Sequence, residues 1–274
     1  MSVAKAVRSE ARDWRTGAIG TYDPTVAQRT IINAARALSR IGVTFRKSAI
    51  RWTQDMRPGP IDYELVGLRV RLCPHLNFRD GAALFSEATF DRRDRAFIVE
   101  HLAPGGVFLD IGANMGIYSL TVGARRPDAR VYAFEPIADV AARLEFNLAA
   151  NRLDGRVFVR TLALGDNTGT LRFSLNSESA VLGEGDITVP CDTLLNVVRM
   201  ERLTRIDAIK IDVEGFEDRV LFPFFAEAPQ QLWPRHVIIE HIMPDVWARN
   251  CLHLLKDRGD APAWRSGFNT GFER

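Results

Sequence analysis

Short apolar runs alternate with longer amphipathic stretches from residue 107 to the end of the chain. The apolar runs predict strands, and the stretches between them, where apolar residues recur every three or four positions, predict helices. Strands are expected at 107–111, 130–135, 156–162, 206–212 and 236–241. Helices are expected near 116–125, at 136–151, from about 216, and near 245–258. This alternation is typical of a parallel sheet with crossover helices, and the tail at 262–273 could add one or two strands.

Two segments depart from this rhythm. Residues 168–190 contain two short β-like pieces, 170–175 and 186–190, which predict a hairpin-like insertion. Before the regular part, residues 63–72 alternate around Gly67, a pattern that predicts a β-hairpin. Residues 90–102 are helical by pattern, and a Pro-Gly-Gly sequence ends that helix just before the first parallel strand.

The amino end is polar and basic. Residues 1–60 contain eleven Lys and Arg against four acids, a charge of +7, whereas the whole chain carries +2. Asp23-Pro24 predicts an N-cap followed by proline in the first turn of a helix. That helix is expected to end near Gly42 and to bury one face, made of Ile31, Ala35, Leu38 and Ile41. We interpret it as packing on the main domain or on a second subunit of a homo-oligomer, in preference to membrane-surface binding.

Composition narrows the class of protein further. With 274 residues, 46% hydrophobic and 26% charged, the chain resembles an ordinary globular protein with room for one large α/β domain and an extension, or for two small domains. Its three cysteines are far apart, which indicates reduced thiols in a cytoplasmic protein. No apolar run is long enough for a transmembrane segment, and the amino end lacks the apolar core of a signal peptide.

The stretch 107–120 carries the clearest chemical signal. A buried strand interrupted only by Asp110 leads into a turn with special residues at alternate positions, Gly112, Asn114 and Gly116. Such a turn is expected to present backbone N–H groups and a helix N-terminus to a ligand. The order D-x-G-x-N-x-G differs from the dinucleotide fingerprint G-x-G-x-x-G. An acid beside this turn suits a ligand with a positively charged or donor-rich end, such as S-adenosylmethionine.

Acidic residues also gather where other strands end. In a doubly wound sheet, ligands bind at the carboxyl ends of the strands, near the switch in strand order. Glu135, 25 residues after Asp110, is placed to accept hydrogen bonds from both ribose hydroxyls of a nucleoside, although an acid before Pro136 also suits a helix N-terminus. Further acids follow the later strands, at Asp212, Glu214 and Glu240.

Three polar side chains allow both a functional and a structural interpretation. Asn114 could contact the ligand from inside the turn or serve only the turn itself. Asp166, after Leu164-Gly165, could accept a hydrogen bond from an adenine amino group, although Gly-Asp is also common turn sequence. We favour a functional role for both. Ser119 could face the ligand or pack its hydroxyl within the helix, and we leave it open.

Taken in order, these motifs resemble the FkbM family of S-adenosylmethionine-dependent methyltransferases, from about residue 90 to the end. The resemblance rests on residues 107–119, 133–136, 163–166, 189–194, 209–217 and 239–241. It implies an α/β, class I methyltransferase (Rossmann-like) fold, a doubly wound, mostly parallel seven-stranded sheet with helices on both faces. It also implies O-methylation of a hydroxyl on a sugar or natural product. The implied cofactor-binding residues are Asp110, Gly112, Asn114, Gly116, Ser119, Glu135, Pro136, Leu164 and Asp166.

One departure from the family pattern concerns an acid after the insertion. The family's Thr-Leu-Asp reads Thr193-Leu194-Leu195 here, and Asp192 precedes it, so the role of that acid stays open. We divide the chain into a basic extension, 1–60, outside the resemblance, and a methyltransferase domain, 61–274. Within that domain we expect a cofactor half at about 104–167, the β insertion at 168–190 and an acceptor-side half at about 204–274.

Methyl transfer to an alcohol requires alignment, exclusion of water and a base for the hydroxyl proton. Asp212, Glu214 and His241 are the candidate catalytic residues, because all three are predicted at the sheet edge beside the cofactor. Acids at a strand end that leads into a helix also suit the helix dipole, and His241 could be a structural histidine. We assign no metal ligand, although the same group could hold a divalent metal that polarises a sugar diol.

Two other classes of protein compete with this reading. A nicotinamide-dependent oxidoreductase would need a glycine where Asn114 stands and a Tyr/Lys or His catalytic set, which we do not find. A degenerate methyltransferase fold could instead serve as a binding module. Nucleic acid is not an expected partner, because the catalytic half is net acidic and lacks a basic stripe with aromatics. The expected partner is a small-molecule or glycan acceptor.

Overall fold

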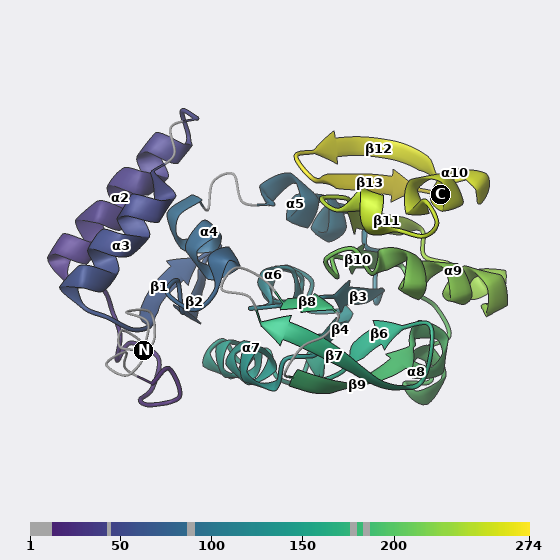
Figure 1. Cartoon of the computed structure of the whole chain (residues 1–274), viewed down its shortest axis with the longest axis horizontal. Helices are drawn as coiled ribbons and strands as arrows, with labels where there is room; N and C mark the ends of the chain where they lie inside the picture. The colour runs from purple at the N-terminus through teal and green to yellow at the C-terminus, as the bar shows by residue number, and fades with distance from the viewer. Residues whose placement is uncertain (1–12, 43–44, 87–90, 176–179, 183–186) are drawn as a thin grey trace. The chain divides into compact units, whose positions relative to one another are not determined.

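The computed structural model describes residues 13–42, 45–86, 91–175, 180–182 and 187–274. The contacts between these residues divide them into two compact units (Figure 1). The N-terminal unit comprises the described residues up to Arg92, together with 146–152. The sheet unit comprises the described residues of 93–145, 153–176 and 180–274. Across these ranges, every helix is too short or too polar to cross a membrane.

A seven-stranded sheet organises the described part of the sheet unit. In spatial order its strands are β12 (Ala261–Ser266), β13 (Asn269–Glu273), β11 (His236–Glu240), β10 (Ala208–Ile211), β3 (Val107–Ile111), β4 (Arg130–Phe134) and β5 (Val157–Arg160). Strands β11, β10, β3, β4 and β5 run parallel, and β13 and β12 add an antiparallel edge. The order reverses between β3 and β10, the position at which doubly wound sheets bind ligands. The predicted fold class is confirmed.

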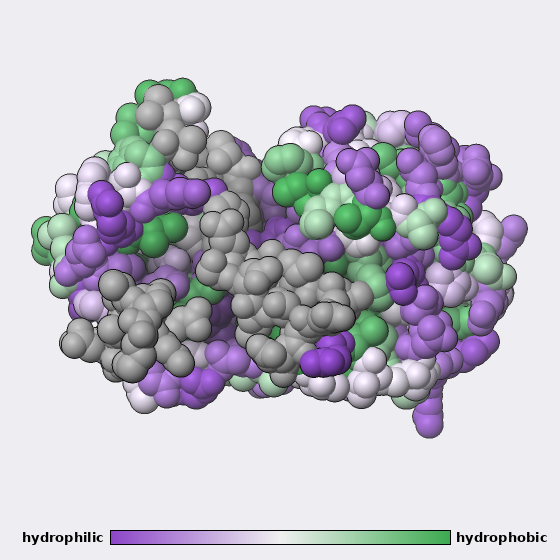
Figure 2. Space-filling model, viewed as in Figure 1, coloured by the Kyte–Doolittle hydropathy of each residue, from purple (hydrophilic) through white to green (hydrophobic). Residues whose placement is uncertain are grey.

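Alternation along the strands divides the core between the two faces of the sheet. Val107, Leu109 and Ile111 of β3 belong to one large buried cluster with residues of the helices that cover this face. These helices are α8 (Leu194–Met200), α9 (Glu217–Glu227) and α10 (Cys251–Asp257). The intervening residues Phe108 and Asp110 point to the other face. On the surface view, hydrophilic and hydrophobic residues are interspersed, as expected when most large apolar side chains are internal (Figure 2).

The remaining helices of the sheet unit precede and follow β3 and β4. They are α5 (Arg92–His101), α6 (Ile117–Arg125) and α7 (Ala138–Ala150), with two short 3₁₀ turns, η1 (Gln230–Leu232) and η2 (Pro244–Val246). The last residues of α7, from 146 onward, are counted with the N-terminal unit. The single helix predicted near 245–258 is wrong in its first part. The chain forms only η2 there, and α10 begins after Asn250, whose side chain accepts a hydrogen bond from the His253 N–H. Asn250 is a typical N-cap residue, so the helix starts at that position.

The predicted insertion is part of a second, smaller sheet. Its strands lie in the order β6 (Ala163–Gly165), β9 (Ile187–Thr193), β7 (Gly169–Leu175) and β8 (Ala180–Leu182). The antiparallel pairing of β7 with β9 confirms the hairpin-like insertion, although Asp186 of the expected second piece lies outside the described residues. Strand β6 pairs in parallel with β9, so the insertion is tied directly to the segment that contains Asp166.

The described part of the N-terminal unit combines three helices with the predicted hairpin. These elements are α2 (Val26–Ser39), α3 (Arg46–Met56), β1 (Ile61–Leu65), β2 (Leu68–Leu72) and α4 (Phe78–Ser86). The hairpin is confirmed, and its two-residue turn, Val66-Gly67, has positive φ at both positions, as a type I′ turn requires.

Two details predicted for the first helix are wrong. Thr25 is the N-cap of α2, and it forms a reciprocal capping box with Gln28 in place of the expected Asp23-Pro24 cap. The buried apolar face is centred on Ile32 and Ala35, while Ile41 is 72% exposed. The helix is rotated by about one residue relative to the expectation because Gln28, buried by its hydrogen bond to the Thr53 carbonyl, also belongs to the inner face.

A buried arginine holds the N-terminal unit together. Arg71 of β2 is fully buried and binds both carboxylate oxygens of Asp62, at 2.8 and 3.0 Å. It also donates to four backbone carbonyls of the preceding segment, those of Trp14, Thr16, Gly17 and Ala18. Asp62 in turn accepts from the backbone N–H groups of Gly20 and Tyr22. One ion pair therefore fixes the segment 14–22 on the hairpin.

Candidate active site

The glycine turn after β3 satisfies its own hydrogen-bond donors. The N–H groups of Gly112 and Ala113 donate to the Phe134 carbonyl, and that of Gly116 donates to the Ala113 carbonyl. The Asn114 N–H donates to Glu135 at 2.9 Å, and the Asn114 side chain accepts from the Met115 N–H. The expectation that this turn presents free N–H groups is therefore wrong for these five positions. The turn is held rigidly against β4.

Two glycines in the turn are required by close packing. Gly112 has φ +76°, and a Cβ at this position would lie 1.9 Å from the Asp212 carbonyl oxygen. Gly116 has φ +85°, and a Cβ there would lie 2.0 Å from Leu144. Because Asp212 directly follows β10, the turn after β3 and the loop after β10 are in backbone contact at the switch point of the sheet.

Asp110 and Ser119, both expected to bind cofactor, bind each other. The Ser119 N–H and hydroxyl both donate to Asp110 Oδ2, at 3.0 and 2.6 Å, and both residues are fully buried. Asp110 Oδ1 is buried and accepts no hydrogen bond from the described residues. Burial raises the pKa of Asp110, while the charge of Lys210 acts in the opposite direction. The carboxylate thus offers one unused acceptor atom beside the glycine turn.

Glu135 is buried at the end of β4 and connects the turn to the next helix. Its Oε2 accepts from the Asn114 N–H and its Oε1 from the Ile137 N–H, both at 2.9 Å. Burial raises the pKa of Glu135 to about 7, against the opposing effects of these hydrogen bonds and of Arg143 and Lys210. A carboxylate oxygen can accept more than one hydrogen bond, so donors from a ligand would stabilise its charged form.

The other expected cofactor residues lie in different environments. Leu164 is buried in the core, and Pro136 is half-buried after β4. Asp166 is exposed just beyond β6, where it accepts a hydrogen bond from Asn167 at 2.9 Å and lies 3.8 Å from Arg219. Asp166 therefore offers an exposed carboxylate, whereas Leu164 and Pro136 have no polar side-chain atoms.

Three carboxylates converge at the ends of β10 and β11. Oxygen atoms of Asp212, Glu214 and Glu240 all lie within 4.8 Å of one another. Asp212 and Glu240 are nearly fully buried, and Glu214, with φ +54°, is half-buried. Close carboxylates repel when ionised, so such a group favours a proton, a cation or a donor-rich ligand. Oxygen ligands of this kind suit Mg²⁺ or Ca²⁺.

Lys210, a residue that the sequence analysis did not single out, neutralises part of this charge. Its Nζ lies 3.0 Å from Asp212 Oδ2 and 5.2 Å from the centre of the Tyr118 ring, and both Lys210 and Asp212 are buried. Lys210 also lies beside Asp110 in the strand register. The sequence did carry a signal for this role, since Lys210 stands between two isoleucines in an apolar strand. A lysine in such a strand is buried, and a buried lysine almost always has a charged partner.

His241 lies outside the carboxylate group. Its Nε2 is 2.9 Å from the Thr270 hydroxyl, and burial lowers its pKa, with a further contribution from Arg265. The residue that joins Asp212 and Glu214 is its neighbour Glu240. Consecutive residues along a strand point to opposite faces, so Glu240 and His241 could not both face the same cluster. Strand alternation was the signal that would have selected Glu240.

Glu217 holds the loop that carries Glu214. Its Oε1 accepts from the Val213 N–H at 2.9 Å and from the Gly215 N–H at 3.4 Å, and its Oε2 accepts from the Trp247 indole at 2.6 Å. The side chain is buried, and burial raises its pKa. Glu217 therefore orients the Glu214 backbone without belonging to the carboxylate group.

Comparison with known proteins identifies the family of the chain. The profile of the Methyltransferase FkbM domain family matches residues 110–260, more than half of the chain. The chain is 32% identical over 108 residues to the 31-O-demethyl-FK506 methyltransferase FkbM of Streptomyces tacrolimicus, a match that covers 39% of this chain and 40% of that one. It is 28% identical over 129 residues to the hexuronic acid methyltransferase AglP of Haloferax volcanii, covering 45% and 52%.

The matched segment begins at Asp110 and includes the glycine turn, Glu135 and all three converging carboxylates. The chain belongs to the FkbM methyltransferase family. It spans only about two fifths and about half of the two relatives named above. Among solved structures, a SAM-dependent O-methyltransferase from Thermotoga maritima superposes with a TM-score of 0.42 at 14% identity, covering 67% of this chain and 61% of that one.

Proposed function

We propose that this chain transfers a methyl group from S-adenosylmethionine to a hydroxyl oxygen of a small-molecule or sugar acceptor. The observation that carries the proposal is the pairing of two acidic sites across the switch point of the sheet. Asp110 and Glu135 flank the glycine turn on one side, and Asp212, Glu214 and Glu240 converge on the other. The backbone contact between Gly112 and Asp212 joins the two sides.

The cofactor side fits the chemistry of S-adenosylmethionine. The buried, unused Oδ1 of Asp110 is an acceptor for a positively charged donor such as an ammonium group. Glu135 would accept the ribose hydroxyls, as acids at this position do in nucleoside-binding sheets. The exposed Asp166 would accept from the adenine amino group. Gly112, Asn114 and Gly116 shape the turn, and Ser119 holds the Asp110 carboxylate in place.

The acceptor side supplies orientation and a base. When bound, S-adenosylmethionine provides a methyl group on a positively charged sulfur. Asp212 or Glu214 would take the proton from the acceptor hydroxyl as the new oxygen–carbon bond forms, which makes the oxygen a better nucleophile. Lys210 donates a hydrogen bond to Asp212 Oδ2 and fixes its position. The carboxylates are preferred over His241 as the base because the His241 Nε2 already contacts Thr270.

The same carboxylate group supports a second role for these residues. Because the oxygen atoms of Asp212, Glu214 and Glu240 lie within 4.8 Å of one another, they could hold a divalent cation that binds the acceptor oxygen. The two roles differ in one measurable respect. A chelator removes activity that depends on a bound metal and leaves activity that depends on a carboxylate base.

The relatives support the acceptor class. One relative is named for 31-O-demethyl-FK506 and the other for hexuronic acid, and these two names support an oxygen acceptor on a small molecule or sugar. Of the alternatives, an oxidoreductase would bind a nicotinamide nucleotide, and a binding module would bind S-adenosylmethionine without turnover.

The proposal is tested by calorimetric titration with S-adenosylmethionine and with NAD, followed by transfer assays with labelled methyl groups and polyhydroxylated acceptors. We expect the chain to bind S-adenosylmethionine and not NAD. The affinity for S-adenosylmethionine should fall about tenfold or more in Asp110→Asn and in Glu135→Gln, because each change removes a charged acceptor. The variant Arg125→Gln, at an exposed site at the end of α6, is the control. Tight binding of NAD would refute the proposal.

A further inference from the structure

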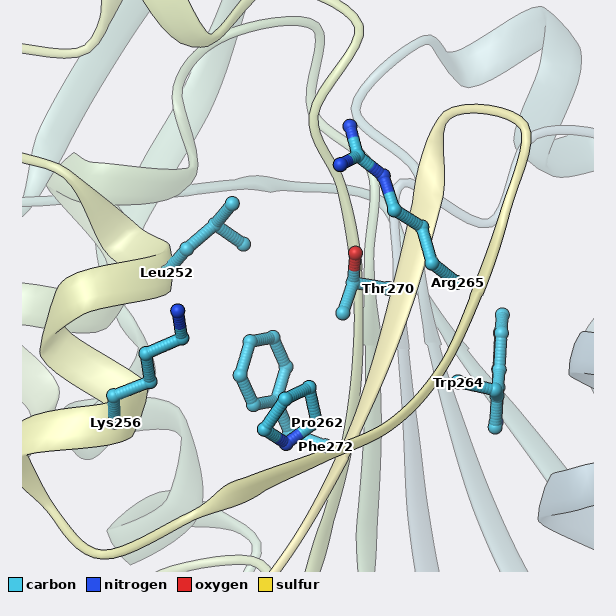
Figure 3. A pocket seen from close by; sticks show the side chains of 7 residues that line it. All are labelled: Leu252, Lys256, Pro262, Trp264, Arg265, Thr270 and Phe272. Carbon is cyan, nitrogen blue, oxygen red and sulfur yellow. The ribbon is translucent and has the colours of Figure 1, made fainter.

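A small pocket lies between α10 and the antiparallel edge of the sheet, within the sheet unit (Figure 3). Its volume is about 310 Å³, at the lower end of the range for small-molecule sites. Lys256 extends from the last turn of α10, and Arg265 lies on β12, so the strands and the helix each bring one cation to the pocket. Between them, Pro262 and Phe272 form an apolar surface.

The polar groups of the pocket are almost all donors. Among the described residues, no carboxylate forms an ion pair with Lys256 or Arg265. The Trp264 ring packs against Phe97 and Arg93 of α5 on the other face of the sheet, so its indole N–H is not one of these donors. The Thr270 hydroxyl, which contacts His241 Nε2, also lines the pocket. Such a set of donors around an apolar surface favours a negatively charged ligand with an apolar body.

The pocket is separate from the carboxylate group. Thr270 and Phe272 are two residues apart on β13, and Phe272 belongs to the core cluster on the face of the sheet covered by α10. Glu240 alternates with Ile239, which is in that same cluster, so Glu240 faces the opposite side of the sheet. An acceptor bound at Glu240 therefore does not fill this pocket.

From this arrangement we infer that the pocket between α10 and β12–β13 is a second binding site, which takes a small organic carboxylate with an aromatic or aliphatic body. Lys256 and Arg265 bind the carboxylate, and Pro262 and Phe272 contact the apolar body. The site goes beyond the proposed methyl transfer, and its ligand need not be the methyl acceptor.

The test uses the full chain, isotope-labelled, and follows its amide and indole N–H resonances by NMR during titration with benzoate. Benzamide, which has the same shape without the charge, and inorganic phosphate, which has the charge without the apolar body, are the matched probes. We expect saturable shifts at Thr270 and Arg265 with benzoate, and at least about tenfold weaker binding of the two controls.

Variants define the site independently of methyl transfer. The change Lys256→Gln combined with Arg265→Gln should weaken benzoate binding about tenfold or more, because it removes both charged donors. Arg125→Gln, which also removes a cation from the last turn of a helix, should leave binding unchanged. Equal binding of benzoate and benzamide, shifts spread outside the pocket, or full affinity in the double variant would each overturn the inference. S-adenosylmethionine binding, measured on the same samples, reports separately on the proposed function.

Discussion

Lys210 and Asp212 form a buried ion pair at the end of β10, with Nζ 3.0 Å from Oδ2 and side chains only 5% and 4% exposed. Two residues of one strand point to the same face, so the lysine is positioned by the same strand as its partner. Lys210 is also the register partner of Asp110, so it lies beside a residue proposed for the cofactor and binds one proposed for the acceptor. Lys210 is therefore the cation on which the charge balance of the site depends.

Replacement of Lys210 by Met should destabilise the fold and reduce activity. The change leaves Asp212 buried without its cation, which typically costs about 3–5 kcal/mol. Urea unfolding measures the loss. The double variant Lys210→Met with Asp212→Asn should recover part of it, because the orphaned charge is removed as well. If the double variant is less stable than the sum of the two single changes predicts, the ion pair does not explain the loss.

Replacement of Gly112 by Ala should lower the free energy of unfolding far more than replacement of Gly105 by Ala, although both glycines have positive φ. The Gly105 Cβ would meet nothing within 4 Å, so only the backbone strain of about 1–2 kcal/mol applies. The Gly112 Cβ would overlap the Asp212 carbonyl, and we expect a loss above about 4 kcal/mol or failure to fold. Thermal and urea unfolding of both variants measure the difference. Equal costs would show that the turn and the β10 loop can separate easily.

The pKa of Glu135, raised to about 7 from 4.5, predicts a specific pH dependence. The folded chain holds this proton more tightly than the unfolded chain, so the stabilising contribution is full below pH 4.5 and is lost as the pH rises through 7. The difference in unfolding free energy between the wild type and Glu135→Gln should therefore fall by roughly 3 kcal/mol between these values. Urea unfolding across this range measures it. A difference that rises with pH would contradict the environment described.

Binding of S-adenosylmethionine should respond to pH in the opposite direction. In the proposed binding mode the ribose hydroxyls donate to the ionised Glu135 carboxylate, so affinity should increase by up to tenfold per pH unit as the pH approaches 7 and then level off. Calorimetry at several pH values measures this dependence, and Glu135→Gln should flatten it. A slope that persists in this variant would assign the titration to another group, such as Asp110.

Replacement of Arg71 by Met should loosen the segment 14–22 within the N-terminal unit. The change removes donors from four carbonyls and leaves Asp62 buried, at a cost of about 3–5 kcal/mol. Arg69→Met is the matched control, since Arg69 lies on the same strand and pairs with Asp23 at the surface, where such pairs contribute less than about 1 kcal/mol. Hydrogen exchange at the Gly20 and Tyr22 amides, which donate to Asp62, should accelerate only in the Arg71 variant.

The order of elements could be predicted from sequence because periodicity follows directly from burial. The strands from 107 onward and the hairpin around Gly67 all show it. Details that depend on a partner elsewhere in the chain could not. Gln28 turns α2 by bonding to the Thr53 carbonyl, and nothing near residue 28 reports that contact. Thr25 and Asp23 are both good caps, and the choice depends on which one has Gln28 three residues later.

In the candidate site, too, some features could be predicted from the sequence and others depended on distant partners. The acids at the strand ends were visible, and the structure brings Asp212 and Glu214 together. The third member, Glu240, required a choice between the last residue of β11 and its neighbour His241, which only strand alternation could decide. The role of Lys210 required the register between β10 and β3, which is a property of the assembled sheet. Whether the N–H groups of the glycine turn are free depended on the Phe134 carbonyl, one strand away.

Those satisfied N–H groups have a consequence for ligand affinity. A turn that completes its own hydrogen bonds keeps its shape before any ligand arrives, so binding does not have to order a loop. The surface proposed to meet the adenosyl group is preorganised, and association should then proceed without a slow conformational step. Specificity at this position then comes from shape and from the few acceptors left unused, chiefly the Oδ1 of Asp110.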